Sequence, residues 1–227
     1  ELFVNSLNCG LTFICRSQNY VKMEELLHNK GQGDLLEGKM LLQIEGGHCC
    51  DPKTNELREI LPKCRMLVDI QDVNNMPVFC LSSYLIAEDN ILSLEQNHLD
   101  LIKNDFSDAT HALIIQAPDT FIQDVYSITG HKIISDRIKY YDYSINTIQM
   151  YMCLTTGDEK IVNNSTMIYD NRYRHLLCKD ISFSNQQEYR FIILDELIKS
   201  PTFYDFQFNS QYKIVSIDEL YENIILD

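Results

Sequence analysis

Basic residues are scarce in this sequence. Only 19 Lys and Arg stand against 33 Asp and Glu, which gives a formal net charge of −14. A chain with this charge repels phosphate backbones unless its few cations are clustered. The composition therefore excludes a generic coat protein for nucleic acids.

Long apolar runs and linker segments are missing as well. No apolar stretch reaches the roughly 18 residues of a membrane-spanning helix, and the first residues, ELFVNSLNCG, lack the basic and apolar regions of a secretory leader. No Pro-, Gly- or Ser-rich segment divides the 227 residues, of which 45% are apolar. We therefore expect a single domain over residues 1–227, with a sizeable core and no membrane partner.

Patterns typical of disulfides and metal sites are weak. Most of the eight cysteines lie inside apolar stretches such as TFIC, PVFC and HLLC, where a free thiol behaves as a small apolar side chain. We therefore expect reduced cysteines and a cytoplasmic protein. The Cys/His cluster GGHCC lacks the paired two-residue spacing of zinc knuckles, so we expect no metal.

The segment GDLLEGKM has Met40 where a phosphate loop needs Ser or Thr, which argues against a nucleoside triphosphate there.

Short apolar runs suited to strands recur along the chain. The predicted strands cover residues 11–15, 39–44, 65–70, 77–81, 111–116, 131–138 and 189–194. FYDFQF and QYKIVS flank Asn209-Ser210, and we expect these two segments to form a hairpin.

Helical patterns lie between the predicted strands. Phe121, Val125 and Ile128 share one helical face, with Pro118 near the start and Gly130 past the end. Similar faces occur over 91–104, where we interpret His98 as a core or boundary histidine, and over 169–177. This order of elements predicts one α+β domain with mixed sheets and peripheral helices.

The segment KDISFSNQQEYRFIIL, residues 179–194, places a polar loop before an apolar strand. Glu188 is predicted to begin the strand, where a side chain can leave the core and face a cleft. On an extended backbone Gln186 and Glu188 point to the same side and can address one ligand. The alternative is that Glu188 is a solvated carboxylate at the strand end and Gln186 a loop residue.

Phe183 to Glu188 resembles the aromatic-x-x-(Glu/Gln)-x-Glu loop of ADP-ribosyltransferases of the Arg-Ser-Glu class, toxin-like enzymes that cleave NAD. The two other signals of that family have counterparts in the same order. Arg16 follows LTFIC, and Ser82 and Ser83 follow PVFCL. The family usually has Ser-Thr-Ser in the middle, so it stays open which of the two serines orients the ligand. The resemblance spans residues 11–194 and implies an ADP-ribosyltransferase-like fold.

The resemblance implies that NAD is the substrate and Glu188 the central catalytic residue. Cleavage of the nicotinamide–ribose bond passes through an oxocarbenium-like ribose, which a carboxylate on the 2′-hydroxyl stabilises. We expect the substitution Glu188→Gln to lower turnover about 10²–10³-fold and to leave the fold intact, because a strand-end position creates no cavity.

The other residues of the motif have distinct expected roles. Gln186 would hold the acceptor, and Phe183 would offer it an apolar surface. Ser82 would fix the carboxylate or the ribose. Arg16, together with Ser82 or Ser83, would bind the cofactor, since a guanidinium can grip a pyrophosphate bidentately.

The acceptor and the class of function stay open. In the resembled family, a Gln two residues before the Glu accompanies modification of Asn side chains and, in some members, of nucleic-acid bases. The charge of −14 favours a protein acceptor, or water in an NAD glycohydrolase, over a long nucleic acid. The family also implies a toxin or a host–parasite conflict system.

Two alternatives compete with an active transferase. One is a non-enzymatic, acidic interaction protein with 13 Tyr that blocks a basic surface of a partner. The other is a transferase-like fold without activity. The active enzyme requires Arg16, Ser82 or Ser83, and Glu188 to lie around one pocket.

Overall fold

The structure is a computed structural model. It describes residues 10–15, 39–44, 47–61, 64–69, 72–84, 91–92, 94–107, 109–128, 130–145, 172–222 and 224–225. The predicted strands listed above are all present, each within two residues of its predicted bounds. Strands and helices occur together in the described chain, which confirms the α+β class. Among the described helices, none combines the length and apolar character that a membrane crossing requires.

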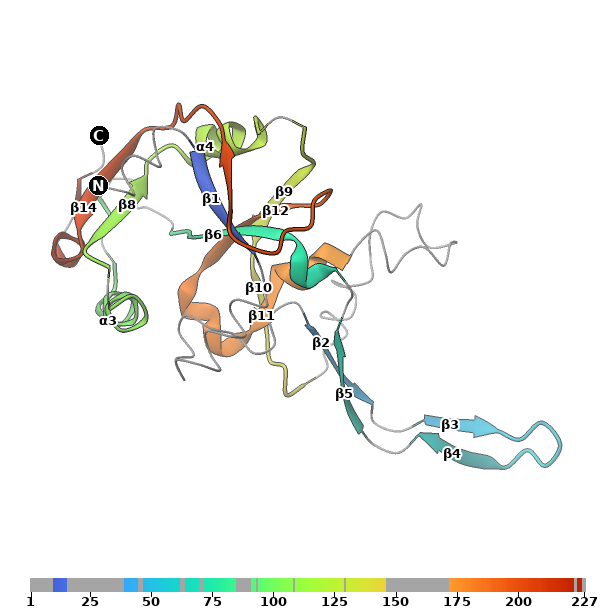
Figure 1. Cartoon of the computed structure of the whole chain (residues 1–227). Coiled ribbons are helices and arrows are strands. Elements are labelled where there is room, and N and C mark those ends of the chain that lie inside the picture. Colours follow the sequence, from blue (N-terminus) through green and yellow to red (C-terminus); the bar gives the residue numbers. More distant parts are fainter. Residues whose placement is uncertain are drawn as a thin grey trace.

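A five-stranded sheet with the strand order β13-β1-β6-β12-β9 forms the centre of the molecule (Figure 1). Its strands are β1 (Gly10–Cys15), β6 (Pro77–Ser82), β9 (Ile133–Arg137), β12 (Glu188–Ile193) and β13 (Thr202–Asp205). Every neighbouring pair in this sheet is antiparallel, so the prediction of mixed strand directions is wrong for the central sheet.

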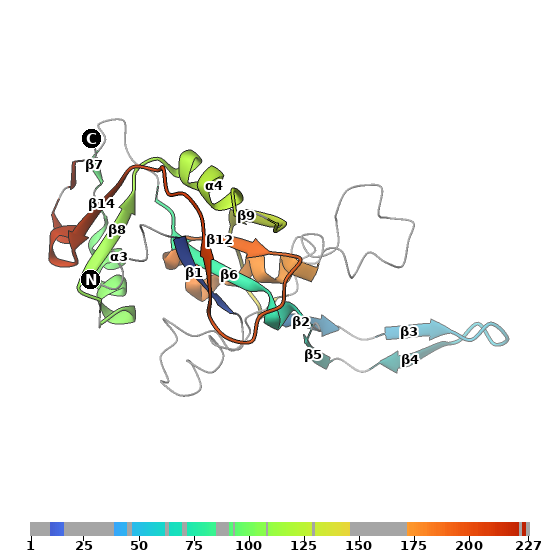
Figure 2. The same ribbon diagram turned by 45° about the horizontal axis from the view of Figure 1, so that its top comes forward.

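Helix α4 (Pro118–Tyr126) packs on one face of the sheet (Figure 2). Side chains alternate along a strand, so Phe191 and Ile193 of β12 point to this face. The ring of Phe121 meets that of Phe191 edge-on, with centroids 5.7 Å apart. The helix predicted from the apolar spacing is thereby confirmed, and Gly130 beyond its end has a φ of +84°, a conformation that suits glycine.

The opposite face carries a layer of short elements. They are η1 (Val73–Asn75), β10 (Lys139–Tyr141), η3 (Arg172–Leu177), β11 (Cys178–Asp180) and η4 (Ile181–Gln186). Leu176 packs here against Ile192, the residue of β12 whose side chain points away from α4. The helix predicted over 169–177 is a 3-10 helix that begins at Arg172, and Tyr169 lies outside the described residues.

The predicted hairpin around Asn209-Ser210 is wrong. β13 pairs with β1, whereas β14 (Tyr212–Ser216) pairs with β8 (His111–Ile115) in a separate two-stranded sheet. The buried carboxylate of Asp124 explains the divergence. It accepts hydrogen bonds from the Asn209 backbone N–H at 2.7 Å, the Asn209 side-chain amide at 2.8 Å and the Ser210 N–H at 2.9 Å. The turn is therefore held by α4 rather than by two paired strands.

Removing this carboxylate is expected to be costly. Asp124→Ala leaves three donors without their acceptor, and a buried donor without a partner costs about 1–3 kcal/mol. We expect the free energy of unfolding, measured in urea, to fall by about 3 kcal/mol. Asp119→Ala, on the exposed first turn of the same helix, is the control and should cost less than about 1 kcal/mol. Equal losses in the two variants would contradict the role of Asp124.

A third group of elements lies beside β8 and β14. It contains β7 (Ile91–Leu92), α3 (Gln96–Asp105), η5 (Asp218–Tyr221) and β15 (Ile224–Ile225). The helix predicted over 91–104 is shorter than expected, because Ile91 and Leu92 pair with β15 and the helix begins at Gln96. His98 is half-buried with its ring 5.9 Å from that of Tyr84, as a boundary histidine should be.

A two-stranded arm projects from the body (Figures 1 and 2). Its base pairs β2 (Lys39–Ile44) with β5 (Cys64–Asp69), and its outer part pairs β3 (Gly47–Cys50) with β4 (Leu57–Leu61). The turn at the tip is held by Asp51, whose carboxylate accepts a hydrogen bond from the Lys53 N–H at 2.9 Å. The strands at 39–44 and 65–70 were visible in the sequence, whereas their joining into an arm was not.

Candidate functional site

Glu188 and Ser82 are direct neighbours across two strands. Glu188 is the first residue of β12 and stands opposite Ser82, the last residue of β6. The Ser82 side chain is exposed and hydrogen-bonds the side chain of Tyr84. Ser83 is half-buried, and its backbone N–H donates to the Gln187 carbonyl at 2.8 Å. The sheet thus brings the candidate serines and the candidate carboxylate to one end.

The Glu188 carboxylate is held by two cations. Lys179 Nζ lies 2.6 Å from Oε1, and Arg190 Nε lies 2.7 Å from Oε2. The exposed fractions of the three side chains are 13% for Glu188, 6% for Lys179 and 1% for Arg190. This buried group, called the ion cluster below, therefore holds one acid and two bases almost entirely away from solvent.

The cations decide the ionisation of Glu188. Burial by itself raises the pKa of a carboxyl group, but the charges of Arg190 and then Lys179 outweigh burial and hold the Glu188 pKa below its usual range. The carboxylate is therefore ionised at neutral pH. The ionised Glu188 carboxylate stabilises the fold through its two ion pairs. Since its pKa is depressed in the folded state, this stabilisation is complete above the unfolded pKa of about 4.5. It is lost as the pH falls through the folded pKa.

Phe183 and Gln186 join Glu188 around Lys179. Gln186 Oε1 accepts a hydrogen bond from Lys179 Nζ at 2.9 Å, and the same nitrogen lies 4.8 Å from the centre of the Phe183 ring. The predicted extended backbone is wrong here, because η4 ends at Gln186 and Gln187 is left-handed with a φ of 45°. A tight helical turn, not strand alternation, brings Gln186 to Glu188.

Backbone contacts fix the position of the ion cluster. The Glu188 N–H donates to the Tyr140 hydroxyl at 2.9 Å, and the Glu188 carbonyl accepts from the Ile138 N–H at 2.9 Å. Arg190 also donates to the Leu176 carbonyl at 2.6 Å. Burial raises the pKa of Tyr140 to about 12, so its hydroxyl remains protonated. The start of β12 is thereby bound to the layer of η3 and β10.

Arg16 lies outside the described residues, but the strand before it is described. β1 ends at Cys15 opposite Pro77, at the first residue of β6. Ser82 is five residues further along β6, which is about 16 Å at the usual rise of a strand. The described strands bring Ser82 to Glu188, and they do not bring the end of β1 to either residue.

Sequence reasoning missed Lys179, Arg190 and Tyr140. A signal existed for Arg190, because residues two apart in a strand share a face and Glu188-x-Arg190 is such a pair. Lys179 carried a weaker signal, a cation that follows the apolar run HLLC. Tyr140 lies 48 residues before Glu188 and had none. Only the pairing of β10 with β11, which sets Tyr140 beside Lys179, reveals its part.

The site offers an ionised carboxylate, two cations, an amide and an exposed hydroxyl at one end of a sheet. In the part of the chain that the structure describes, no three His, Cys, Asp or Glu side chains are grouped so as to hold a metal ion. The arrangement is suited to polar recognition and to the stabilisation of charge.

Three comparisons with known proteins found no match. No protein-family model, no curated protein and no solved structure matches this chain.

Proposed function

We propose that the end of the sheet at Ser82 and Glu188 binds NAD, and that the protein transfers ADP-ribose to a macromolecular acceptor or to water. The observation that supports this proposal is the direct cross-strand pairing of Ser82 with Glu188. The proposal also includes an ADP-ribosyltransferase-like fold, on the resemblance of the Phe183 to Glu188 segment.

The proposed chemistry uses the ionised state of Glu188. A carboxylate has about four acceptor positions, and the two cations use one on each oxygen. The ribose 2′-hydroxyl would donate to one of the remaining positions, where the negative charge stabilises the oxocarbenium-like ribose. The two cations partly neutralise the negative charge of Glu188. The ligand must therefore draw Lys179 away from Oε1 before the carboxylate can stabilise the ribose with its full charge.

The remaining roles follow from the positions around Lys179. Gln186 and Phe183 lie on the η4 side of Glu188, where the acceptor would approach. Ser82 would bind the ribose from β6. The contact of Arg16 with the pyrophosphate remains a prediction from the resemblance. The acidic character of the chain favours a protein acceptor over a long nucleic acid.

Nicotinamide release from NAD tests this proposal. We expect the wild type to release nicotinamide and Ser82→Ala to lower the rate about tenfold, the effect of one lost hydrogen bond of about 1.4 kcal/mol. Gln186→Ala should reduce transfer to an acceptor and leave hydrolysis by water in place. Ser200→Ala and Gln207→Ala, at exposed positions away from the site, are matched controls.

Two results would reject the proposal. One is a wild-type protein that neither releases nicotinamide nor binds NAD in calorimetry. The other is an active protein in which Ser82→Ala and its control Ser200→Ala have the same rate. Thermal unfolding of each variant checks that a loss of rate does not reflect a loss of fold.

The ion cluster also favours a second candidate function. Both oxygens of Glu188 already contact cations, so the residue is placed to hold the fold together rather than to act on a ligand. In that case the formal net charge of −14 favours a non-enzymatic, acidic interaction protein that blocks a basic surface of a partner. Absence of both NAD binding and nicotinamide release in the wild type distinguishes this candidate from the enzyme, whereas a loss of stability in Glu188→Gln is expected under both.

A further inference from the structure

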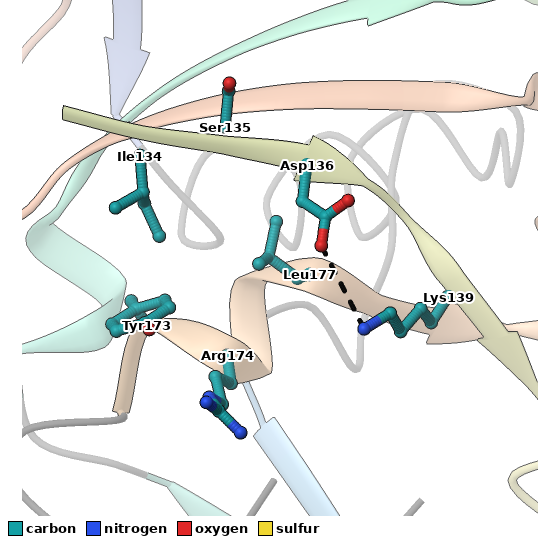
Figure 3. A pocket seen from close by; sticks show the side chains of 7 residues that line it. All are labelled: Ile134, Ser135, Asp136, Lys139, Tyr173, Arg174 and Leu177. Carbon is teal, nitrogen blue, oxygen red and sulfur yellow. Dashed lines mark ion pairs between the residues drawn. The ribbon is translucent and has the colours of Figure 1, made fainter. Parts of the chain in front are cut away.

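A pocket of about 230 Å³ lies at the β9 edge of the central sheet (Figure 3). It is lined by side chains from β9, β10 and η3. These are Ile134, Asp136, Lys139, Tyr173, Arg174 and Leu177. Ser135 also borders the pocket, but its side chain points away and hydrogen-bonds the hydroxyls of Tyr126 and Tyr189. None of the lining residues belongs to the ion cluster, so the pocket is a separate site.

The pocket combines an apolar wall with a charged rim. Ile134, Leu177 and the ring of Tyr173 provide the wall. Lys139, Arg174 and Asp136 provide the rim, where Lys139 Nζ lies 3.9 Å from Asp136 Oδ2. The other oxygen, Asp136 Oδ1, accepts a hydrogen bond from the Arg137 N–H at 2.8 Å.

The described residues of the rim include more basic than acidic side chains. Lys139 and Arg174 are two cations beside the carboxylate of Asp136, while the protein carries a formal net charge of −14. Charges beyond a Debye length of about 8–10 Å are largely screened, so a small ligand meets the rim rather than the whole molecule. A guanidinium binds a carboxylate or phosphate through two parallel hydrogen bonds, and a lysine adds a mobile point charge.

We propose that this pocket binds a small anion that carries a flat ring, the chemistry shared by nucleoside monophosphates and aromatic carboxylates. The anionic group lies between Arg174 and Lys139, and the ring lies against Tyr173, Ile134 and Leu177. Asp136 accepts a hydrogen bond from a hydroxyl or amino group of the ligand. The volume is below the 300–1,000 Å³ typical of pockets for drug-sized ligands, so the pocket holds one ring with its anionic group and does not enclose a dinucleotide. The proposal is therefore independent of NAD cleavage at Glu188.

Calorimetric titration of the full chain tests the proposal with defined probes. These are adenosine 5′-monophosphate, 4-hydroxybenzoate, uncharged adenosine and inorganic phosphate. We expect at least one of the two ring-bearing anions to bind more tightly than adenosine and phosphate, and its affinity to fall with added salt. Tighter binding of the monophosphate identifies a phosphate ligand, and tighter binding of the benzoate identifies a carboxylate ligand.

Variants of the rim sharpen the test. Arg174→Met should weaken the bound probe about tenfold or more, the effect of a lost charge-assisted contact. Asp136→Asn keeps an acceptor oxygen for the hydroxyl or amino group of the ligand and removes a negative charge beside the anion, so it should strengthen binding. Tyr173→Ala should weaken the ring-bearing probe and leave inorganic phosphate unchanged. Lys139→Met should also weaken the bound probe, and Lys199→Met, at an exposed lysine away from the pocket, is its matched control.

Several results would overturn the proposal. They are no binding of either ring-bearing anion at millimolar concentration, equal binding of adenosine, or unchanged affinity in a folded Arg174→Met variant. If Arg174→Met does not fold, Arg174→Lys keeps the charge and removes the planar fork, and it should still weaken the bound probe. Unchanged binding in both Arg174→Lys and Lys139→Met, each measured separately, would also reject the site.

Discussion

Replacing Arg190 with Met is expected to lower the free energy of unfolding by about 3–5 kcal/mol. The guanidinium is 1% exposed and bonds both the Glu188 carboxylate and the Leu176 carbonyl. Met follows the Arg side chain as far as about Nε, so the change keeps the packing of the apolar stem and removes the guanidinium with its charge and hydrogen bonds. Among the described residues, it leaves Lys179 as the one cation paired with the buried Glu188. Urea unfolding at pH 7, followed by circular dichroism, measures the effect.

Arg58→Met is the matched control for this substitution. Arg58 also pairs with a carboxylate, that of Asp51 at 3.4 Å, but its side chain is 64% exposed on the projecting arm. Exposed pairs contribute about 0–1 kcal/mol, because water screens the charges and replaces the lost contact. A loss below 1 kcal/mol in Arg190→Met would show that the buried cluster does not hold β12 in place.

The same geometry corrects an expectation about Glu188→Gln. From the sequence, this change at a strand end was expected to leave the fold intact. In the structure it removes the carboxylate that pairs with two buried cations, Lys179 and Arg190. Breaking a buried ion pair from one side is strongly destabilising. Turnover in this variant must therefore be compared per mole of folded protein, and Ser82→Ala is the cleaner probe of chemistry.

Lowering the pH from about 6.5 to about 4 is expected to remove about 3 kcal/mol of stability through His175. His175 is 6% exposed, and its Nδ1 meets no hydrogen-bond partner among the described residues. Burial lowers its pKa to about 4 from an ordinary value of 6.5. Between these two values the unfolded chain binds a proton that the folded chain does not, so stability rises with pH across the window.

His175→Leu isolates this contribution. Leu has a similar volume, fits an apolar layer and cannot take up a proton. The unfolding free energies of the wild type and of His175→Leu should therefore differ most in their dependence on pH between 4 and 6.5. The other titrating groups are common to both proteins and cancel in the difference. Parallel pH curves for the two proteins would show that His175 is not buried in its neutral form.

The individual strands and helices could be predicted from the sequence because each depends on a pattern of neighbouring residues. β-branched and apolar runs predicted the strands, and the spacing of Phe121 and Val125 predicted α4. The Glu188 segment was read correctly as a strand that begins at the motif. Its preceding turn was not, because the left-handed conformation of Gln187 has no reliable signature in a non-glycine residue.

Contacts between segments that are distant in the sequence could not be predicted. The pair FYDFQF and QYKIVS looked like a hairpin, yet Asp124, more than 80 residues earlier, holds the turn between them and separates the strands. In the same way, Glu188 was predicted to leave the core at the start of its strand and to face a cleft. Its two cations come from β11 and from its own strand, and only the stacking of the β11 layer on the sheet buries them.

The sequence by itself determined the α+β class, the strand positions and the acidic balance, because propensity, periodicity and charge are summed over neighbouring residues. Only the tertiary structure decided which of those residues meet. Ser82 meets Glu188 through the antiparallel register of β6 and β12, and the pocket at Lys139 and Arg174 forms where η3 packs under β9. Contacts of this kind join residues that are far apart in the sequence. The repeat of apolar side chains every two residues in a strand or every 3.6 in a helix shows which face is buried, but not which segment packs against it.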